Sequence, residues 1–243
     1  MTSDILTMLR YDRKSRLIAA AAPARSRPVT ERRRPRRPPA KRTYHHRDLR
    51  EALLAAALAA LPAVGAERLS LRALARDAGV SEAAPYHHFA DKDALLAAVA
   101  AQCSLLLLEA LHAAVEEAGD DQRRRFQLTG IAYVRFAVAH PAHFRAMELP
   151  GVAARMPADV RRRVDAFYRE EERRMRAAQQ QGLLAPLPFD NLILAATSLV
   201  HGLAHLIIDG ATPVVAGDVE HAARLARDVT AVLGLGVLPR PAS

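Results

Sequence analysis

The stretch LSLRALARDAGVSEAAPYHHFADKDALL, residues 69–96, decides the fold. Its first half places apolar residues at helical spacing behind Ser70, a residue type that favours a helix N-cap. Gly79 follows, where the end of a helix requires a left-handed residue without a Cβ atom. Ser81 is a second N-cap candidate. The pattern predicts a helix, a tight turn and a second short helix, which form a helix-turn-helix over about residues 69–92.

The second helix of this unit is expected at about residues 82–88, with Ala84, Phe89 and His88 packed inward. Its outer face carries small residues that permit close approach to base edges, and two side chains that can donate to phosphate oxygens. Pro85 removes a backbone hydrogen bond, so a short or distorted first turn is expected. The candidate DNA-contacting residues are Ser70, Arg72, Ser81, Glu82, Ala83, Tyr86, His87 and Lys92.

Two of these candidates have particular chemistry. Lys92 begins the next helix, where its ammonium group and the free backbone N–H groups make an anion site. Glu82 is acidic and would face a polyanion. It either accepts a hydrogen bond from a cytosine N4 amine or acts on Arg76 without reading a base. Base reading is favoured, and both roles stay open.

The same stretch resembles the DNA-binding domain of the TetR (tetracycline repressor) family of bacterial regulators. It follows the family pattern T-R-IA-AGVS-LY-HF-K-L, with Ser70 where Thr is usual and Leu74 where Ile is usual. The matching positions are Gly79, Val80, Ser81, Tyr86, Phe89, Lys92 and Leu95. The resemblance implies a dimeric, one-component transcriptional regulator that binds double-stranded DNA at a palindromic operator.

A second resemblance lies in the C-terminal half. The segments YVRFAVAHPAHFRAMEL (133–149) and LVHGLAHLIIDG (199–210) are similar to the TetR C-terminal domains named for a Trp-His-Gly motif. His201 and Gly202 supply two of the three motif residues. Thr197 stands where Trp is typical, so a small hydroxyl replaces a large ring.

The remaining sequence predicts an all-α fold, because helical periodicity continues to the end and no segment alternates with period two. Leu192 to Ile208 is interpreted as a buried helix rather than a membrane span, because polar residues interrupt it. We expect a basic, disordered extension at 1–43, a helix-turn-helix domain at 44–92 and a helical ligand-binding and dimerisation domain at 93–243. The helices are expected at about 46–61, 71–78, 82–88, 91 or 92–118, 121–139, 142–147, 158–181, 189–209 and 218–233.

Charge is concentrated at the N-terminus. Residues 1–43 hold 13 Lys and Arg against 3 Asp and Glu, a net +10, and the other 200 residues hold 22 against 23, a net −1. The extension is either a solvated leader, including a misassigned start, or a basic arm that follows phosphates. Cys103 is the lone cysteine, so a disulfide framework is excluded and a reducing compartment is indicated. A cytoplasmic, nucleoid-associated protein is therefore expected, with no membrane partner.

The C-terminal helices predict a cavity for a small apolar or amphipathic effector, since bundle cores are common ligand sites. The candidate lining residues are Tyr133, Phe136, Met147, Phe167, Thr197 and His201. The last two helices are apolar and contain small residues, so we expect them to form the homodimer interface.

Other sites are not expected. No catalytic motif is present, so the protein is not expected to be an enzyme, and no cofactor is predicted. His201 and His205 share a helix face, and His140 or His143 could add a third ligand, but a functional metal site is not predicted. Cys103 is expected to be a buried, inert thiol.

Two alternatives remain open at this point. The Arg-rich extension could make the chain a sequence-indifferent basic DNA-binding protein, which a salt titration would reveal. The chain could instead be a helical ligand-binding or metal-buffering protein whose DNA motif is vestigial.

Overall fold

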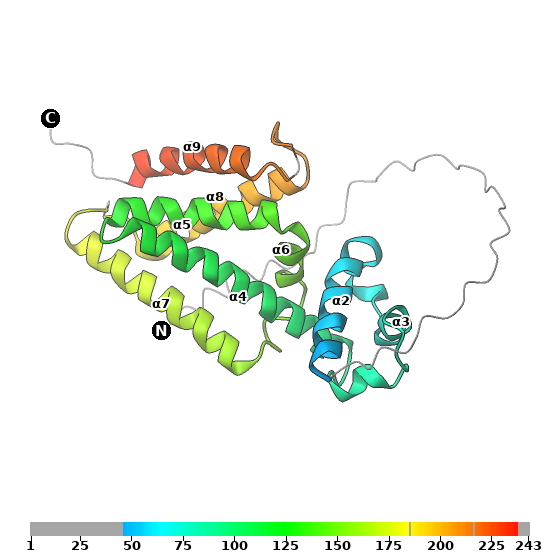
Figure 1. The fold of residues 1–243 in the computed structure, drawn as a ribbon. Helices are drawn as coiled ribbons and strands as arrows, with labels where there is room; N and C mark the ends of the chain where they lie inside the picture. Colours follow the sequence, from blue (N-terminus) through cyan, green and yellow to red (C-terminus); the bar gives the residue numbers. More distant parts are fainter. Residues whose placement is uncertain (1–45, 185, 216, 238–243) are drawn as a thin grey trace. The chain divides into compact units, whose positions relative to one another are not determined.

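The computed structural model describes residues 46–184, 186–215 and 217–237, so the predicted disordered extension at 1–43 lies outside the described residues. The regular elements in these ranges are helical, which confirms the predicted all-α class (Figure 1). They are α2 (His46–Arg68), α3 (Leu71–Asp77), the 3-10 helix η1 (Ala84–His87), α4 (Lys92–Ala118), α5 (Gln122–Ala139), α6 (Pro141–Met147), α7 (Ala158–Gln180), α8 (Phe189–Ile208) and α9 (Val219–Val237).

Most helix ends lie within a residue or two of the predicted ones, but two do not. The helix α2 was expected to stop near residue 61, yet it continues through Pro62 and is interrupted only at Gly65, where φ is 72°. Pro62 has no N–H, so the carbonyl four residues before it lacks its helical hydrogen-bond donor. Because Pro62 is exposed, water can bind this carbonyl instead. The backbone dihedral angles of Gly65 lie outside the α-helical region, in a range that glycine adopts most easily. The helix α9 extends four residues past the predicted end at residue 233.

One buried cluster forms the N-terminal core. Leucines of α2, α3 and α4 pack together with Phe89, which follows η1. Ala146 of α6 and Val152 of the loop after α6 belong to the same cluster. The N-terminal core is therefore completed by residues from the C-terminal half. The complete cluster consists of Leu49, Leu53, Leu54, Ala57, Leu61, Leu69, Leu71, Leu74, Phe89, Leu95, Leu96, Val99, Ala100, Cys103, Ala146 and Val152.

A second cluster joins α4, α5 and α7, and we call it the α4–α7 cluster. It contains Leu107, Leu108 and Leu111 of α4 with Phe136 of α5 and Phe167 of α7. The C-terminal half of α4 thus packs in this cluster, while its first turns pack in the N-terminal core. Both environments bury α4, which is why its apolar residues surround the helix rather than form one stripe.

Cys103 lies on α4 at the inner end of the N-terminal core and is 1% exposed. Burial raises the pKa of its thiol to about 12. The predicted buried thiol is confirmed, and at neutral pH it is protonated and a poor nucleophile.

The helices α5, α8 and α9 pack closely on one another (Figure 1). Gly130 of α5 lies at their meeting point. A Cβ atom at Gly130 would come within 3.2 Å of Val200 and 3.3 Å of Thr230, so the absence of a side chain permits this approach. Thr230 is buried, and its hydroxyl donates to the carbonyl oxygen of Ala226 on its own helix.

Three helices, α2, α4 and α8, are by length and composition apolar enough to cross a membrane. Their burial differs. The most apolar window of α4 is 61% buried, but that of α8 is only 22% buried. The expectation that residues 192–208 form a buried helix is therefore wrong for the single subunit. The helix α8 packs one face on α5 and leaves apolar residues such as Leu194 and Leu206 at the surface.

Candidate nucleic-acid interface and solvent-open cavity

The turn after α3 is fixed by two backbone hydrogen bonds. The Val80 N–H donates to the Ala75 carbonyl at 3.0 Å, and the Gly79 N–H donates to the Arg76 carbonyl at 3.0 Å. These are the two bonds of a Schellman motif, whose central residue must be left-handed. Gly79 has φ 69°, as predicted. Ser70 occupies the predicted N-cap position, but its side chain makes no capping hydrogen bond.

The segment after this turn differs from the prediction. An α-helix was expected at 82–88, but the structure forms only the 3-10 helix η1, and Ala83 rather than Ser81 is its N-cap. Pro85 is the reason, because it has no N–H for an α-helical bond. Pro85 is itself buried, and its carbonyl accepts from the Phe89 N–H at 3.0 Å. The predicted distortion is confirmed, and Pro85 anchors the segment to the core.

The DNA-contact candidates lie at the surface around this segment. All are exposed except Lys92, which is half-buried, and Tyr86 is 47% exposed although its ring is apolar. They lie at the N-cap and on the first turn of α3, in the turn before η1, on η1 and at the start of α4. The exposed members are Ser70, Arg72, Ser81, Glu82, Ala83, Tyr86 and His87.

Glu82 pairs with arginines of α3. Its carboxylate accepts a hydrogen bond from Arg76 at 2.9 Å, and Arg72 lies at 4.0 Å. The pair joins α3 to the turn that precedes η1. This geometry corresponds to the second of the two roles considered for Glu82, namely the positioning of Arg76.

The start of α4 carries a compact polar network. The Lys92 ammonium donates to the Glu67 carbonyl at 3.0 Å. Asp91 caps the helix by accepting from the Ala94 N–H at 2.7 Å. That bond, together with Arg155, holds the pKa of Asp91 below its ordinary value. Arg155, in the loop after α6, also lies 3.5 Å from Asp93. No local sequence pattern predicts this contact, since 62 or more residues separate the partners.

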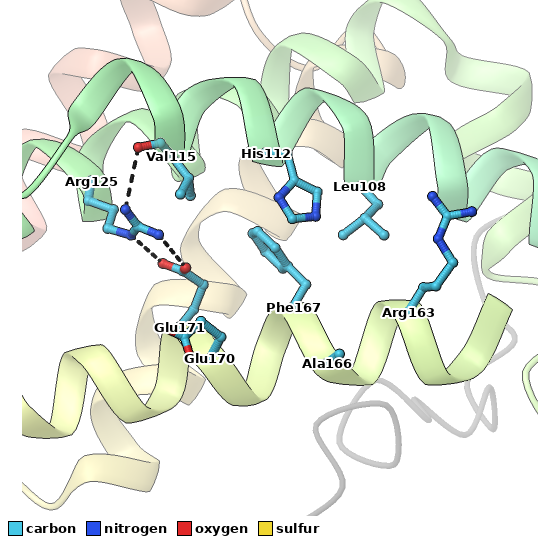
Figure 2. Close-up of a pocket in the computed structure, with 9 residues that line it drawn as sticks. All are labelled: Leu108, His112, Val115, Arg125, Arg163, Ala166, Phe167, Glu170 and Glu171. Atoms are coloured by element: carbon cyan, nitrogen blue, oxygen red, sulfur yellow. Dashed lines mark hydrogen bonds and ion pairs between the residues drawn. The ribbon is translucent and has the colours of Figure 1, made fainter. Parts of the chain in front are cut away.

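A cavity of about 370 Å³ lies between α4 and α7 (Figure 2). Apolar side chains form its wall, with charged groups from α5 and α7 at its margins. His112 packs edge-on against Phe167, with 4.8 Å between ring centroids. The lining residues are Leu108, His112, Val115, Arg125, Arg163, Ala166, Phe167, Glu170 and Glu171.

The predicted lining residues are distributed differently. Phe167 borders the cavity, and Phe136 belongs to the adjoining α4–α7 cluster, against which Tyr133 and Met147 pack. The Tyr133 hydroxyl hydrogen-bonds His201 Nδ1 at 2.8 Å, away from the cavity lining. Thr197 is half-buried on α8, one turn before His201.

A nearly buried ion pair closes one end of the cavity (Figure 2). Arg125 donates to both carboxylate oxygens of Glu171, at 2.7 and 2.8 Å, and the two side chains are 10% and 16% exposed. The carboxylate raises the pKa of Arg125. The carbonyl oxygens of Val115 and Gly119 accept further guanidinium hydrogen bonds. Sequence reasoning missed this pair because 46 residues separate its members.

Family models match both halves of the chain. The model described as bacterial regulatory proteins, tetR family, matches residues 53–99. The model described as tetracyclin repressor-like, C-terminal domain, matches residues 126–230. The chain belongs to the TetR family. The Trp-His-Gly subclass is named in neither description and stays a prediction.

Solved structures share the fold of this chain. A Rhodococcus sp. RHA1 protein of unknown function is 36% identical, with a TM-score of 0.64 over 82% of this chain and 100% of that one. A TetR family regulator from Marinobacter aquaeolei VT8 is 24% identical, with a TM-score of 0.59 over 79% and 96%. The ketosteroid regulator KstR2 of Mycobacterium tuberculosis, 17% identical, shares the fold with a TM-score of 0.58 over 79% and 96%. No curated protein matched the sequence.

Family membership has two consequences for the chain. TetR-family members are regulatory proteins that bind DNA through an N-terminal helix-turn-helix, so this chain is a DNA-binding transcriptional regulator. The chain is correspondingly not an enzyme, as the sequence predicts.

We predict that Glu171→Ala lowers the free energy of unfolding by about 3 kcal/mol, because it leaves the Arg125 guanidinium charged and poorly solvated. Replacing both residues by leucine should cost less than this single change, since no unpaired charge remains. Urea denaturation followed by circular dichroism measures both.

Glu170→Ala is the matched control for this prediction. Glu170 is one position away on α7, and its pairs with Arg173 and Arg174 are exposed. It should change stability little. Equal effects of the two single substitutions would show that the Arg125–Glu171 pair has no special role.

Proposed function

We propose that this TetR-family chain is a ligand-responsive repressor that binds a near-palindromic operator as a homodimer. The observation that carries the proposal is the exposure of the helix-turn-helix face. Its Pro85 and Phe89 are held in the core, while Tyr86 and His87 between them face solvent. A regulator of this kind would act in the cytoplasm, at the nucleoid.

The proposed dimer sets the spacing of the two helix-turn-helix units on DNA. Two copies of η1 would enter successive major grooves about 34–36 Å apart, on half-sites related by twofold symmetry. Outside the N-terminal extension the chain has a net charge of −1 by the count given above, so affinity must come from local contacts rather than from bulk charge. Arg72 and Lys92 are the Arg and Lys residues among the proposed contacts, and Arg76 is a further exposed arginine on α3.

We predict that Tyr86→Ala weakens operator binding about tenfold, which corresponds to roughly 1.4 kcal/mol. Tyr86 is exposed, so its removal should leave the fold intact while a phosphate contact is lost. The operator is first selected from a random duplex library and then used in gel-shift titrations. Arg169→Ala, which removes an exposed cation on α7, is the control and should bind as wild type.

The selection itself tests the proposal and its alternative. A recovered palindrome supports the repressor, whereas uniform affinity for all sequences, lost when residues 1–43 are removed, supports the sequence-indifferent alternative.

Selection with Glu82→Ala separates the two roles of Glu82. A changed motif assigns base reading, and an unchanged motif assigns the positioning of Arg76.

The exposed face of α8 supports dimerisation. Leu194, Ser198, Gly202 and Leu206 follow one another at four-residue spacing, which makes a ridge on one side of the helix. Leu194 is 46% and Leu206 is 51% exposed. A Cβ atom at Gly202 would meet nothing within 4 Å, so the space beside it is open in the subunit. Two such ridges, together with α9, would form a four-helix interface.

We predict that Leu206→Arg converts the dimer to a monomer, because it places an unpaired charge in an apolar contact. Analytical ultracentrifugation measures the change. Leu106→Arg is the control, since Leu106 is a similarly exposed leucine on α4, and it should remain dimeric. A dimeric Leu206→Arg variant would remove α8 from the interface.

The cavity between α4 and α7 supports a response to an effector. Its volume of about 370 Å³ falls in the range of small-molecule sites, and its wall is largely apolar. The helix α4 runs from the start of the proposed contact face to this cavity. An effector that prefers a different inclination of α4 would shift the dimer away from the DNA-binding state. Coupling of about 1–3 kcal/mol would weaken operator binding roughly 5–150-fold.

We predict that Ala166→Trp fills the cavity and abolishes binding of an amphipathic probe, 1-anilinonaphthalene-8-sulfonate, without preventing operator binding. Probe fluorescence and gel shift measure the two properties. Leu183→Trp adds the same ring at an exposed position in the turn after α7 and should leave the probe signal unchanged. Unchanged probe binding to Ala166→Trp would place the effector elsewhere.

A further inference from the structure

Three metal-ligating side chains converge where α6 meets α8. Glu148 is the residue directly after α6, and His201 and His205 lie four residues apart on α8. One oxygen of Glu148, Oε1, is 3.1 Å from His201 Nε2 and 2.8 Å from His205 Nε2. The three donor atoms lie within 4.8 Å of one another. The side chains are about one third exposed, so an ion could enter from solvent.

The surroundings hold both imidazoles in place. Phe144 of α6, which is fully buried, packs against the two rings with centroid distances of 5.6 and 5.3 Å. The Tyr133 hydroxyl bonds His201 Nδ1, the nitrogen that faces away from Glu148. A ring whose Nδ1–H donates to Tyr133 presents the Nε2 lone pair to the site. Such outer contacts usually orient the histidines that bind metals.

We propose that Glu148, His201 and His205 form a binding site for a divalent transition-metal ion, with Zn²⁺ as the reference occupant. Two imidazole nitrogens and one carboxylate oxygen are a ligand set that Zn²⁺ accepts, with water in the fourth position. The pair of histidines also suits Ni²⁺, Co²⁺ and Cu²⁺, whereas Mg²⁺ and Ca²⁺ require oxygen ligands.

The two nitrogen–oxygen distances are close to those that an ion requires, and the two histidine nitrogens lie within 4.8 Å of each other. Tetrahedral ligands at the usual Zn–N and Zn–O lengths lie roughly 3.4 Å from one another. The two observed nitrogen–oxygen distances, 2.8 and 3.1 Å, are shorter by only a few tenths of an ångström. A small side-chain rotation would therefore admit the ion. The sequence had suggested His140 or His143 as a third ligand, but those two rings pack on each other, and Glu148 takes the place.

The site has a consequence for regulation, which rests on the proposed function. The helix α6 packs against α2 and α4, and its Ala146 is part of the N-terminal core. An ion held between Glu148 and α8 would fix the end of α6 to the C-terminal bundle. The metal would thereby bias the position of the helix-turn-helix, and operator binding would change metal affinity by the same factor.

Isothermal titration of the untagged full-length protein, stripped with a chelator, with ZnCl₂ tests the site without any DNA. We expect one ion per subunit. Glu148→Gln and His205→Gln should each weaken binding at least tenfold, because each removes one ligand. His221→Gln, a half-exposed histidine on α9, is the control and should bind as wild type. Tetrahedral Co²⁺ absorption in the wild type, lost in the two ligand variants, is the spectroscopic counterpart.

The outcomes are distinct. No binding at micromolar Zn²⁺, or equal binding by the ligand variants and the control, would reduce the three residues to a hydrogen-bonded group and overturn the site. Circular dichroism of each variant excludes unfolding as the cause of lost binding. A gel shift on the selected operator with and without Zn²⁺ then tests the coupling. Metal binding that leaves operator affinity unchanged would keep the site and overturn its regulatory role.

Discussion

The burial of α4 in two different cores is the constraint on which the rest of this structure depends. Leu95, Leu96 and Val99 pack among the helices of the DNA-binding half, and Leu107 to Leu111 pack against α5 and α7. Each fully buried leucine contributes roughly 1.5–3 kcal/mol. The helix therefore cannot leave either core without a large cost, so a change of inclination at one end must be accommodated at the other. This property is the basis for proposing α4 as the link between the cavity and the DNA-binding face.

The helix-turn-helix face depends on this anchoring as well as on its own turn. Gly79 sets the direction of the chain after α3, but the short η1 has too few backbone bonds to be stable alone. Pro85 and Phe89 hold it by their burial against α2, α3 and α4. The ion pair of Glu82 with Arg76 adds a link across the turn at the surface, where such pairs contribute little to stability.

In the C-terminal half, polar contacts between distant segments determine the chemistry. Arg125 and Glu171 close the cavity, and Glu148 meets two histidines of α8. The same helix α8 turns one face to α5 and another, apolar, to solvent. A single helix thus contributes to the bundle core, to the proposed metal site and to the proposed dimer interface. A structural change at one of these places is therefore expected to shift the other two.

Features that depend on neighbouring residues could be predicted from the sequence. Gly79, Ser70 and the apolar spacing placed α3 and its turn, and helical periodicity with Gly and Pro breakers placed most other helices. Tertiary structure decided what depends on distant partners. It left one face of α8 uncovered, and paired Arg125 with Glu171 and Glu148 with His205. Helical propensity and caps are local, whereas a side-chain pair separated by dozens of residues is defined only once the helices have packed.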